Sequence, residues 1–212
     1  MIVAMVNVDY ETNVFINCPF DAEYRSVLEA LVFAVHDAGF RARCALEYSD
    51  SAVNRFAKIT QIVKECRFAI HDISRTEFTK VGREMLPRFN MPLELGLFLG
   101  SKAFGDRNHQ IKQCLILDRK LYRYRAFISD LAGQDISCHN NKPTDAIREV
   151  CKWLTTVSGL KNIPGGTVVT QRFRQFQRQL PIFYDALKKT PEDVTFVDYS
   201  FAVTDWIQIN VL

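Results

Sequence analysis

The sequence predicts an α/β fold in which helices cover both faces of a parallel sheet, followed by a helical and aromatic C-terminal extension. Short apolar runs alternate with segments whose apolar residues recur at helical spacing, a pattern typical of parallel strands joined by crossover helices. Glycines and prolines separate these segments where turns are required. After Asn162-Ile-Pro-Gly-Gly166 the strand pattern stops and only helical spacing continues.

The expected elements follow one another at regular intervals. Strands are expected at 13–18, 40–46, 67–73 and 114–117. Helices are expected at 21–38, after Ser49 or Ser51, around Glu94, near 122–131 and at 144–157. Asp21 is suited to cap the first helix and Gly39 to end it. A loop of about fifteen residues is expected after residue 73, and loops of that length often carry function.

The best candidate for a domain boundary is the glycine-containing segment 162–166. Residues 1–161 would then form the α/β domain, and residues 162–212 the extension. Within the extension, apolar side chains share one face of a helix from 170 to 189, which Pro181 is expected to kink or divide. Burial of each large apolar side chain is worth on the order of 1.5–3 kcal/mol. We therefore expect the extension to pack on the main domain or on a partner subunit.

Composition excludes several classes of protein. The 212 residues carry a net charge of +3, from 27 basic and 24 acidic side chains, which is too small an excess to indicate nucleic-acid binding. No apolar run approaches a membrane span, and the N-terminal residues lack the basic start of a signal peptide, so a cytoplasmic protein without a membrane partner is expected. The six cysteines include no C-x-x-C pair, and the histidines lack ligand spacing. Buried free thiols and no metal site are therefore expected.

The most informative segment is Asn90-Met-Pro-Leu-Glu-Leu-Gly-Leu-Phe-Leu-Gly100, which predicts an apolar helix with Glu94 in its first turn. Pro92 is well suited to a helix start. The leucines on both sides of Glu94 indicate a partly buried carboxylate. If the neighbouring strands end nearby, Glu94 points into the crevice where open α/β sheets bind ligands. The alternative is that Glu94 caps free N–H groups and complements the helix dipole.

Four loops that follow strand ends are expected to converge at one edge of the sheet, where binding residues concentrate: 17–21, 47–50, 71–75 and 87–94. Asp72 is suited to hold ribose hydroxyls or to orient Glu94, and Ser74 to contact the same substrate. Alternatively, Asp72 or Ser74 caps a turn. Asn17 could hold a phosphate and Phe20 could stack on a base, although a strand-end turn and a core position explain them as well.

Three further polar residues are candidates for substrate contacts. Arg55 offers a planar guanidinium to a phosphate, or else it pairs with a carboxylate on a helix surface. Arg88 and Asn90 precede Glu94 directly, so the loop that carries them is expected to place them beside the same ligand.

The order of an apolar strand, an Asp-bearing loop, a Glu-Leu-Gly helix and a following strand resembles the nucleoside 2-deoxyribosyltransferase group. It also resembles Toll/interleukin-1 receptor (TIR) domains, whose enzymatic members cleave NAD with a helix-borne glutamate. Val14-Phe-Ile-Asn17 is similar to the first TIR strand and its loop. The resemblance covers roughly the first two-thirds of the chain. Phe89-Asn-Met-Pro92 replaces the Gly-rich approach of many transferases, and the helix lacks the tryptophan common in TIR enzymes.

The resemblance implies a flavodoxin-like fold and an N-glycosidase, a hydrolase or transferase that acts on NAD or a related nucleotide or nucleoside without a cofactor. Glu94 would attack or stabilise an oxocarbenium-like centre, with Asp72 as its orienter. The same resemblance implies a role in bacterial antiviral defence, with a homo-oligomer or a defence-system protein as partner. Two alternatives stay open. One is a non-catalytic nucleotide-sensing or self-associating module, which the absent tryptophan favours. The other is a nucleic-acid-associated protein that uses Arg172, Arg174 and Arg178.

Overall fold

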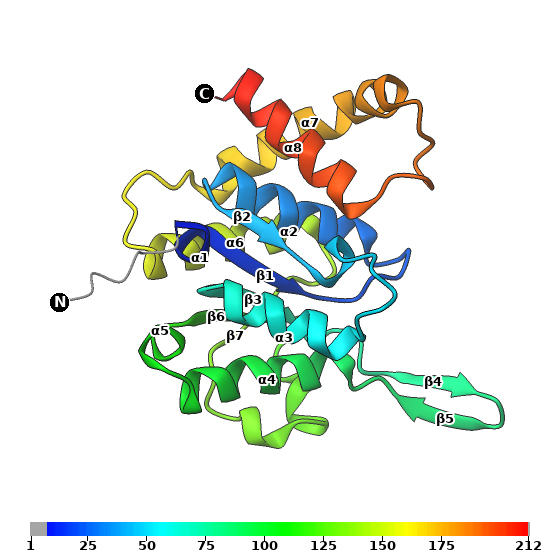
Figure 1. Cartoon of the computed structure of the whole chain (residues 1–212), viewed down its shortest axis with the longest axis vertical. Coiled ribbons are helices and arrows are strands. Elements are labelled where there is room, and N and C mark those ends of the chain that lie inside the picture. Colours follow the sequence, from blue (N-terminus) through cyan, green and yellow to red (C-terminus); the bar gives the residue numbers. More distant parts are fainter. Residues whose placement is uncertain (1–7, 212) are drawn as a thin grey trace.

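The structure is a computed structural model that describes residues 8–211. At its centre is a five-stranded parallel sheet with the strand order β2-β1-β3-β6-β7 (Figure 1). The strands are β1 (Asn13–Asn17), β2 (Arg41–Arg43), β3 (Phe68–Asp72), β6 (Gln113–Asp118) and β7 (Ile136–Cys138). This order, with helices on both faces, is that of flavodoxin-like folds. The predicted fold class is therefore confirmed.

Two helices cover each face of the sheet. On one face lie α2 (Arg25–Asp37) and α6 (Pro143–Val157), and on the other α3 (Arg55–Glu65) and α4 (Asn90–Phe104). Successive side chains of β1 alternate between these faces: Val14 and Ile16 join the α2 side, and Phe15 joins the α3 side. Because both faces are covered, the inner strands β1, β3 and β6 are apolar along most of their length.

The remaining elements are short or lie outside the sheet. They are α1 (Val8–Thr12), η1 (Ala45–Glu47), α5 (Arg107–Gln110), η2 (Arg123–Ala126), η3 (Ser129–Leu131), and the hairpin of β4 (Phe78–Val81) and β5 (Glu84–Pro87). The hairpin projects from the body of the molecule on the side of α3 and α4 (Figure 1).

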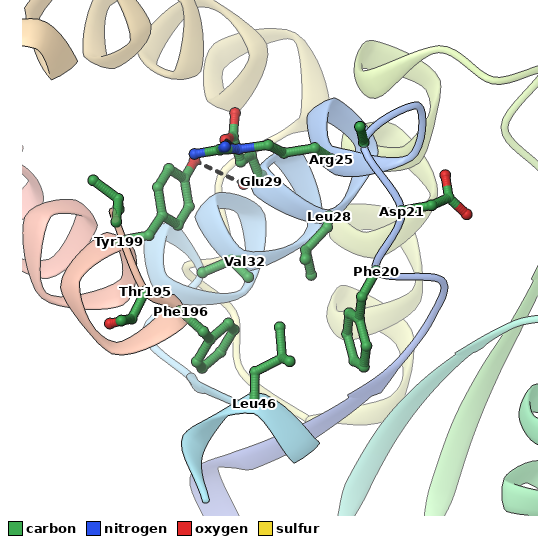
Figure 2. Close-up of a pocket in the computed structure, with 12 residues that line it drawn as sticks. Phe20, Asp21, Arg25, Leu28, Glu29, Val32, Leu46, Thr195, Phe196 and Tyr199 are labelled. Atoms are coloured by element: carbon green, nitrogen blue, oxygen red, sulfur yellow. Dashed lines mark hydrogen bonds and ion pairs between the residues drawn. The ribbon is translucent and has the colours of Figure 1, made fainter. Parts of the chain in front are cut away.

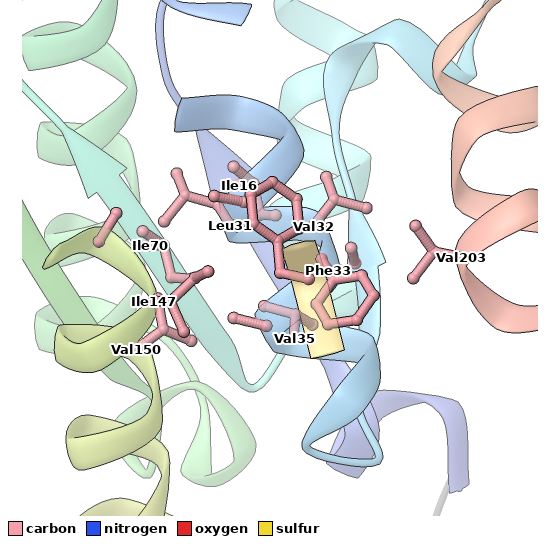
Figure 3. Close-up of a cluster of buried hydrophobic side chains, with 14 of the residues drawn as sticks. Ile16, Leu31, Val32, Phe33, Val35, Ile70, Ile147, Val150 and Val203 are labelled. Atoms are coloured by element: carbon pink, nitrogen blue, oxygen red, sulfur yellow. The ribbon is translucent and has the colours of Figure 1, made fainter. Parts of the chain in front are cut away.

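Helix α2 forms the centre of the largest hydrophobic core because it is covered on two sides. Ile16 and Ile70 reach it from the sheet, and Val203 reaches it from α8 (Phe196–Asn210), as Figure 3 shows. The five consecutive residues 31–35 are all 0% exposed. A helix that is apolar around its whole circumference is typical of such a fully buried position.

The outer cover of α2 is the C-terminal pair α7 (Gly166–Leu187) and α8 (Phe196–Asn210) (Figure 1). The ring of Phe33 on α2 lies 5.4 Å from the rings of both Phe173 and Phe176, and 5.8 Å from Trp206. Of the two outcomes predicted for Pro181, a kink or a division of the helix, division does not occur, because α7 continues to Leu187. Pro181 has no backbone N–H to donate, so one hydrogen bond of the helix is missing there. The nearby side chains of Leu180 and Tyr184 are buried, and their packing keeps the helix intact.

Several local predictions were wrong. Helix α3 is capped by Asn54, whose Oδ1 accepts a hydrogen bond from the N–H of Ala57 at 2.8 Å, and not by Ser49 or Ser51. The expected long loop contains the β4–β5 hairpin, in which Gly82 adopts a φ of 61° suited to a two-residue turn. The helical stretch expected at 122–131 is present as two short 3-10 helices, η2 and η3, rather than as one α-helix.

All six cysteines are free thiols, as predicted. Cys18, Cys44, Cys66 and Cys151 are buried, whereas Cys114 and Cys138 are partly exposed. Within residues 8–211, no helix is long and apolar enough to cross a membrane. The same residues contain no cluster of three His, Cys, Asp or Glu side chains that could hold a metal ion.

Candidate functional site

The strand order makes the carboxyl ends of β1 and β3 the switch point of the sheet. The chain leaves these neighbouring strands toward opposite sides of the sheet, and flavodoxin-like folds bind ligands at this switch point. The start of α4 belongs to the same edge, because Asn17 at the end of β1 donates a hydrogen bond to the carbonyl of Met91 at 3.0 Å. The loops after β1 and β3 therefore meet the helix that bears Glu94.

Glu94 lies on the buried face of α4 and is only 7% exposed. The sequence predicts Glu94 in the first turn of this helix. The helix begins at Asn90, however, so Glu94 lies in the second turn. No side chain caps the start of α4, which means that Glu94 does not act as a capping residue. Burial raises the pKa of Glu94 to about 7, and the positive charge of Arg55 lowers it in part. Near neutral pH the carboxyl group is therefore present in both protonation states, as suits an acid–base or nucleophilic group.

Arg55 connects two of the candidate residues. It is the first residue of α3, and its Nη2 lies 4.0 Å from Oε1 of Glu94. Its guanidinium carbon also lies 5.9 Å from the centre of the Phe20 ring. The Arg55 side chain is 56% exposed, so it can shift toward an incoming anion at little cost.

Replacing Arg55 by Gln is expected to raise the pKa of Glu94, because the guanidinium charge favours the ionised carboxylate. With a nucleoside substrate, which has no phosphate for Arg55 to bind, an activity that needs ionised Glu94 should then fall several-fold at pH 6 and change little at pH 9. A pH–rate profile measures this shift. The matched control is Lys64→Gln, which removes one positive charge from the other end of α3. A midpoint that stays in place or moves to lower pH would show that Arg55 does not act on Glu94.

Asn17 holds together β1, β3 and the start of α4. Its Nδ2 donates to the carbonyl of Met91 and lies 2.9 Å from Nδ1 of His71. Burial lowers the pKa of His71 to about 3, so the ring is neutral and its Nδ1 can accept this hydrogen bond. The amide nitrogen predicted to hold a phosphate is thus used within the protein.

Asn17→Ala is expected to destabilise the protein by about 1–3 kcal/mol, because it leaves the buried Nδ1 of His71 unpaired. It should also reduce any activity of Glu94, since the first turn of α4 loses its anchor on β1. Asn13→Ala is the matched control. Asn13 is equally buried at the other end of β1, and its Nδ2 donates to the carbonyl of Glu65. Urea unfolding and activity assays should show a stability loss in both variants and an activity loss in Asn17→Ala alone. Equal activity in the two variants would contradict this role.

Asp72 and Ser74 meet a residue that sequence reasoning missed, His139. Its Nε2 lies 2.9 Å from both Oδ2 of Asp72 and Oγ of Ser74, and none of the three residues is more than 1% exposed. The backbone N–H of Asn141 donates to Nδ1 of His139 at 3.1 Å, so in the neutral ring the proton is on Nε2. In a Ser-His-Asp hydrolase, the serine and the aspartate contact different ring nitrogens of the histidine, whereas here Ser74 and Asp72 both lie beside Nε2. The cluster therefore fastens the end of β3 to the loop after β7.

This cluster gives Asp72 partners other than Glu94. Its Oδ1 accepts a hydrogen bond from the backbone N–H of Ser74 at 2.8 Å, and its Oδ2 faces His139. The turn-capping alternative considered from the sequence accounts for the first of these bonds. The orienting role of Asp72 toward Glu94 stays a prediction.

Arg88 and Asn90 lie on the exposed rim of this edge. Nη1 of Arg88 is 3.8 Å from Oδ2 of Asp21, and Asn90 is the exposed first residue of α4. A shallow hollow of about 350 Å³ lies beside Arg88 and is also lined by Arg75 and Arg119. These arginines are paired with carboxylates, Arg75 and Arg88 with Asp21 and Arg119 with Glu77, so the rim carries charges of both signs.

A second, apolar hollow of about 350 Å³ lies between α2, η1 and α8 (Figure 2). Phe20 lines it, whereas Glu94 does not. Because Arg55 lies near both Phe20 and Glu94, the two places adjoin each other.

No protein-family model, curated protein or solved structure matches the chain. Function must therefore follow from the chemistry of this edge of the sheet. Its distinctive group is the nearly buried carboxyl of Glu94, whose pKa is raised by burial to about 7 and which lies 4.0 Å from the exposed guanidinium of Arg55.

Proposed function

We propose that the chain cleaves the N-glycosidic bond of NAD or of a related nucleotide or nucleoside, with Glu94 as the catalytic carboxylate. The observation that supports this proposal is Glu94 itself. It is 7% exposed at the switch-point edge, is not used as a helix cap, and has a pKa raised by burial to about 7. Buried carboxyl groups with raised pKa values concentrate at catalytic sites, because a solvated surface position is otherwise preferred.

The chemistry asked of this carboxylate is displacement at C1′ of a ribose. As the bond from C1′ to the base nitrogen breaks, its electron pair leaves with the base and positive charge develops on the sugar. Ionised Glu94 stabilises that charge or attacks C1′ to form a glycosyl ester. Water then hydrolyses this ester, or a second base takes the sugar from it and releases the Glu94 carboxylate. Nicotinamide leaves NAD as a neutral molecule, because the pyridinium nitrogen takes up the electron pair. A site with one titrating carboxyl group therefore suffices for NAD.

Arg55 has two roles in this proposal. Its charge keeps part of the Glu94 population ionised at neutral pH, and its exposed guanidinium can pair with a substrate phosphate. The cluster of Asp72, Ser74 and His139 keeps the loops of β3 and β7 in place beneath the ligand.

One observation favours a second candidate, a nucleotide-sensing module without catalysis. The polar groups of Asn17 and Asp72 make hydrogen bonds within the protein, so fewer groups are free to distort a substrate. The nucleic-acid alternative has less support, because Arg172 pairs with Asp37 at 3.0 Å. The sensing module predicts ligand binding without turnover.

The test is to incubate the purified full-length protein with NAD, NADP and a panel of ribo- and deoxyribonucleosides, and to separate any free base by chromatography. The proposal predicts release of a base by the wild type. Binding of a nucleotide by calorimetry, without base release between pH 5 and pH 9, would support the sensing module and overturn catalysis. If the protein neither binds a nucleotide nor releases a base, both proposals are overturned.

A further inference from the structure

The hollow between α2 and α8 has an apolar interior with aromatic rings from two distant parts of the chain. Figure 2 shows the rings of Phe20 and Phe196 on either side of Leu46, with Leu28 and Val32 on the α2 side. Phe20 comes from the loop after β1, and Phe196 is the first residue of α8. Both rings are half-buried. A volume of about 350 Å³ falls in the range of small-molecule sites.

The polar groups around this hollow already have partners. Nε of Arg25 lies 3.0 Å from Oε1 of Glu29, and the Tyr199 hydroxyl donates to the carbonyl of Glu29 at 3.1 Å. Asp21 points away from the hollow (Figure 2). The interior thus offers stacking and apolar contact to a flat aromatic ring.

The hollow adjoins the Glu94 carboxylate through Phe20. The Phe20 ring faces the hollow, and the guanidinium of Arg55 lies 5.9 Å from the centre of that ring and 4.0 Å from Glu94. In a nucleotide, the base is attached directly to C1′, the atom that Glu94 is proposed to attack. A sugar beside Glu94 whose base points toward Arg55 therefore brings that base to the Phe20 side of the hollow.

We infer that this hollow is the subsite for the base of the nucleotide, and that Phe196 of the C-terminal extension forms one of its walls. This inference rests on the proposed function, since it assumes that the sugar lies beside Glu94. The extension then has two roles: it covers α2, and it takes part in selecting the base. Purine and pyridine rings fit such a site through their faces, because aromatic stacking tolerates different bases.

The test measures binding to protein that carries Glu94→Gln, so that no turnover is needed. Phe196→Ala is compared with Phe201→Ala, the same change on the same helix at a side chain that is 63% exposed and does not line this hollow. Calorimetry with NAD, with free nicotinamide or adenine, and with ribose 5-phosphate separates the base from the sugar phosphate. A second variant, Leu46→Trp, fills the hollow from a side chain that is 43% exposed, so the fold should tolerate it.

Phe196→Ala and Leu46→Trp are expected to weaken binding of NAD and of the free base by roughly 5- to 100-fold, the range for loss of one base-stacking ring. Ribose 5-phosphate binding and the Phe201→Ala variant should stay within about twofold of the reference. The inference is overturned if the wild type releases a base from NAD while both hollow variants keep its KM. Base-dependent binding without turnover would instead support the subsite and overturn the catalytic proposal.

Discussion

Glu94→Gln is expected to abolish base release and, at the same time, to make the protein more stable at pH 8. Gln keeps the volume of the side chain but cannot stabilise positive charge on the sugar. The pKa of Glu94 in the folded protein, about 7, lies above the ordinary value of 4.5. Ionisation of Glu94 therefore opposes folding. The contribution of Glu94 to the free energy of unfolding falls as the pH rises from about 4.5 to 7. Removing the carboxyl group relieves a cost on the order of 1–3 kcal/mol at pH 8.

Urea unfolding at pH 5 and pH 8 measures this effect, and the gain in stability of Glu94→Gln should be larger at pH 8. Glu65→Gln on α3 is the matched control, because the hydrogen bonds of Glu65 with Gln61 and Arg43 lower its pKa. Ionised Glu65 therefore stabilises the folded protein above its ordinary pKa, and this stabilisation is lost as the pH falls. The Glu65→Gln variant should thus be less stable than the wild type at pH 8. If Glu94→Gln turns over substrate within a few-fold of wild type, or gains no stability at pH 8, the role of Glu94 is wrong.

Truncation after Gly166 is expected to give aggregated or poorly expressed protein. The truncation removes α7 and α8, and with them the three rings that surround Phe33 on α2. Each large side chain uncovered costs on the order of 1.5–3 kcal/mol, and several together exceed the whole stability of a typical domain, about 5–15 kcal/mol. Size-exclusion chromatography and thermal melting of the fragment measure the outcome.

Two point variants in full-length protein test the same packing without truncation. Phe176 on α7 is 0% exposed and contacts the rings of Phe33, Tyr199 and Trp206, so Phe176→Ala should cost about 3–5 kcal/mol. Ile182 on the same helix is 67% exposed, and Ile182→Ala should change the free energy of unfolding by less than about 0.5 kcal/mol. A monodisperse fragment 1–166 with an unchanged melting temperature would show that the extension is a separable unit.

The features that could be predicted from the sequence are those with a local cause. Strands β1, β3 and β6 could be predicted because burial on both faces makes them largely apolar, as in Val14-Phe-Ile16 and Phe68-Ala-Ile70. Glu94 was found because a carboxylate between leucines on an apolar helix is costly unless it has a role. Its low exposure in the structure agrees with that reasoning.

The features that could not be predicted depend on contacts between distant parts of the chain. His139 meets Ser74 across 65 positions, and Asn17 meets Met91 across 74, so no local spacing indicates either pair. The wall formed by Phe196 depends on how α8 packs against α2, which the apolar pattern of α8 alone does not define. Helix starts were misplaced for a different reason: Ser49, Ser51 and Asn54 are all good capping residues, and only the packing of α3 selects Asn54.

The central claim is that a buried carboxyl at position 94 faces a nucleotide, and its titration tests that claim most directly. Carbon-13 NMR of protein labelled at the glutamate carboxyl groups, with the Glu94 signal identified by its loss in Glu94→Gln, gives the pKa of this one group. We predict a midpoint near pH 7 in the free protein, and a displaced midpoint when NAD or a competent nucleoside is added. A midpoint near 4.5 that does not respond to any of these ligands would contradict the account.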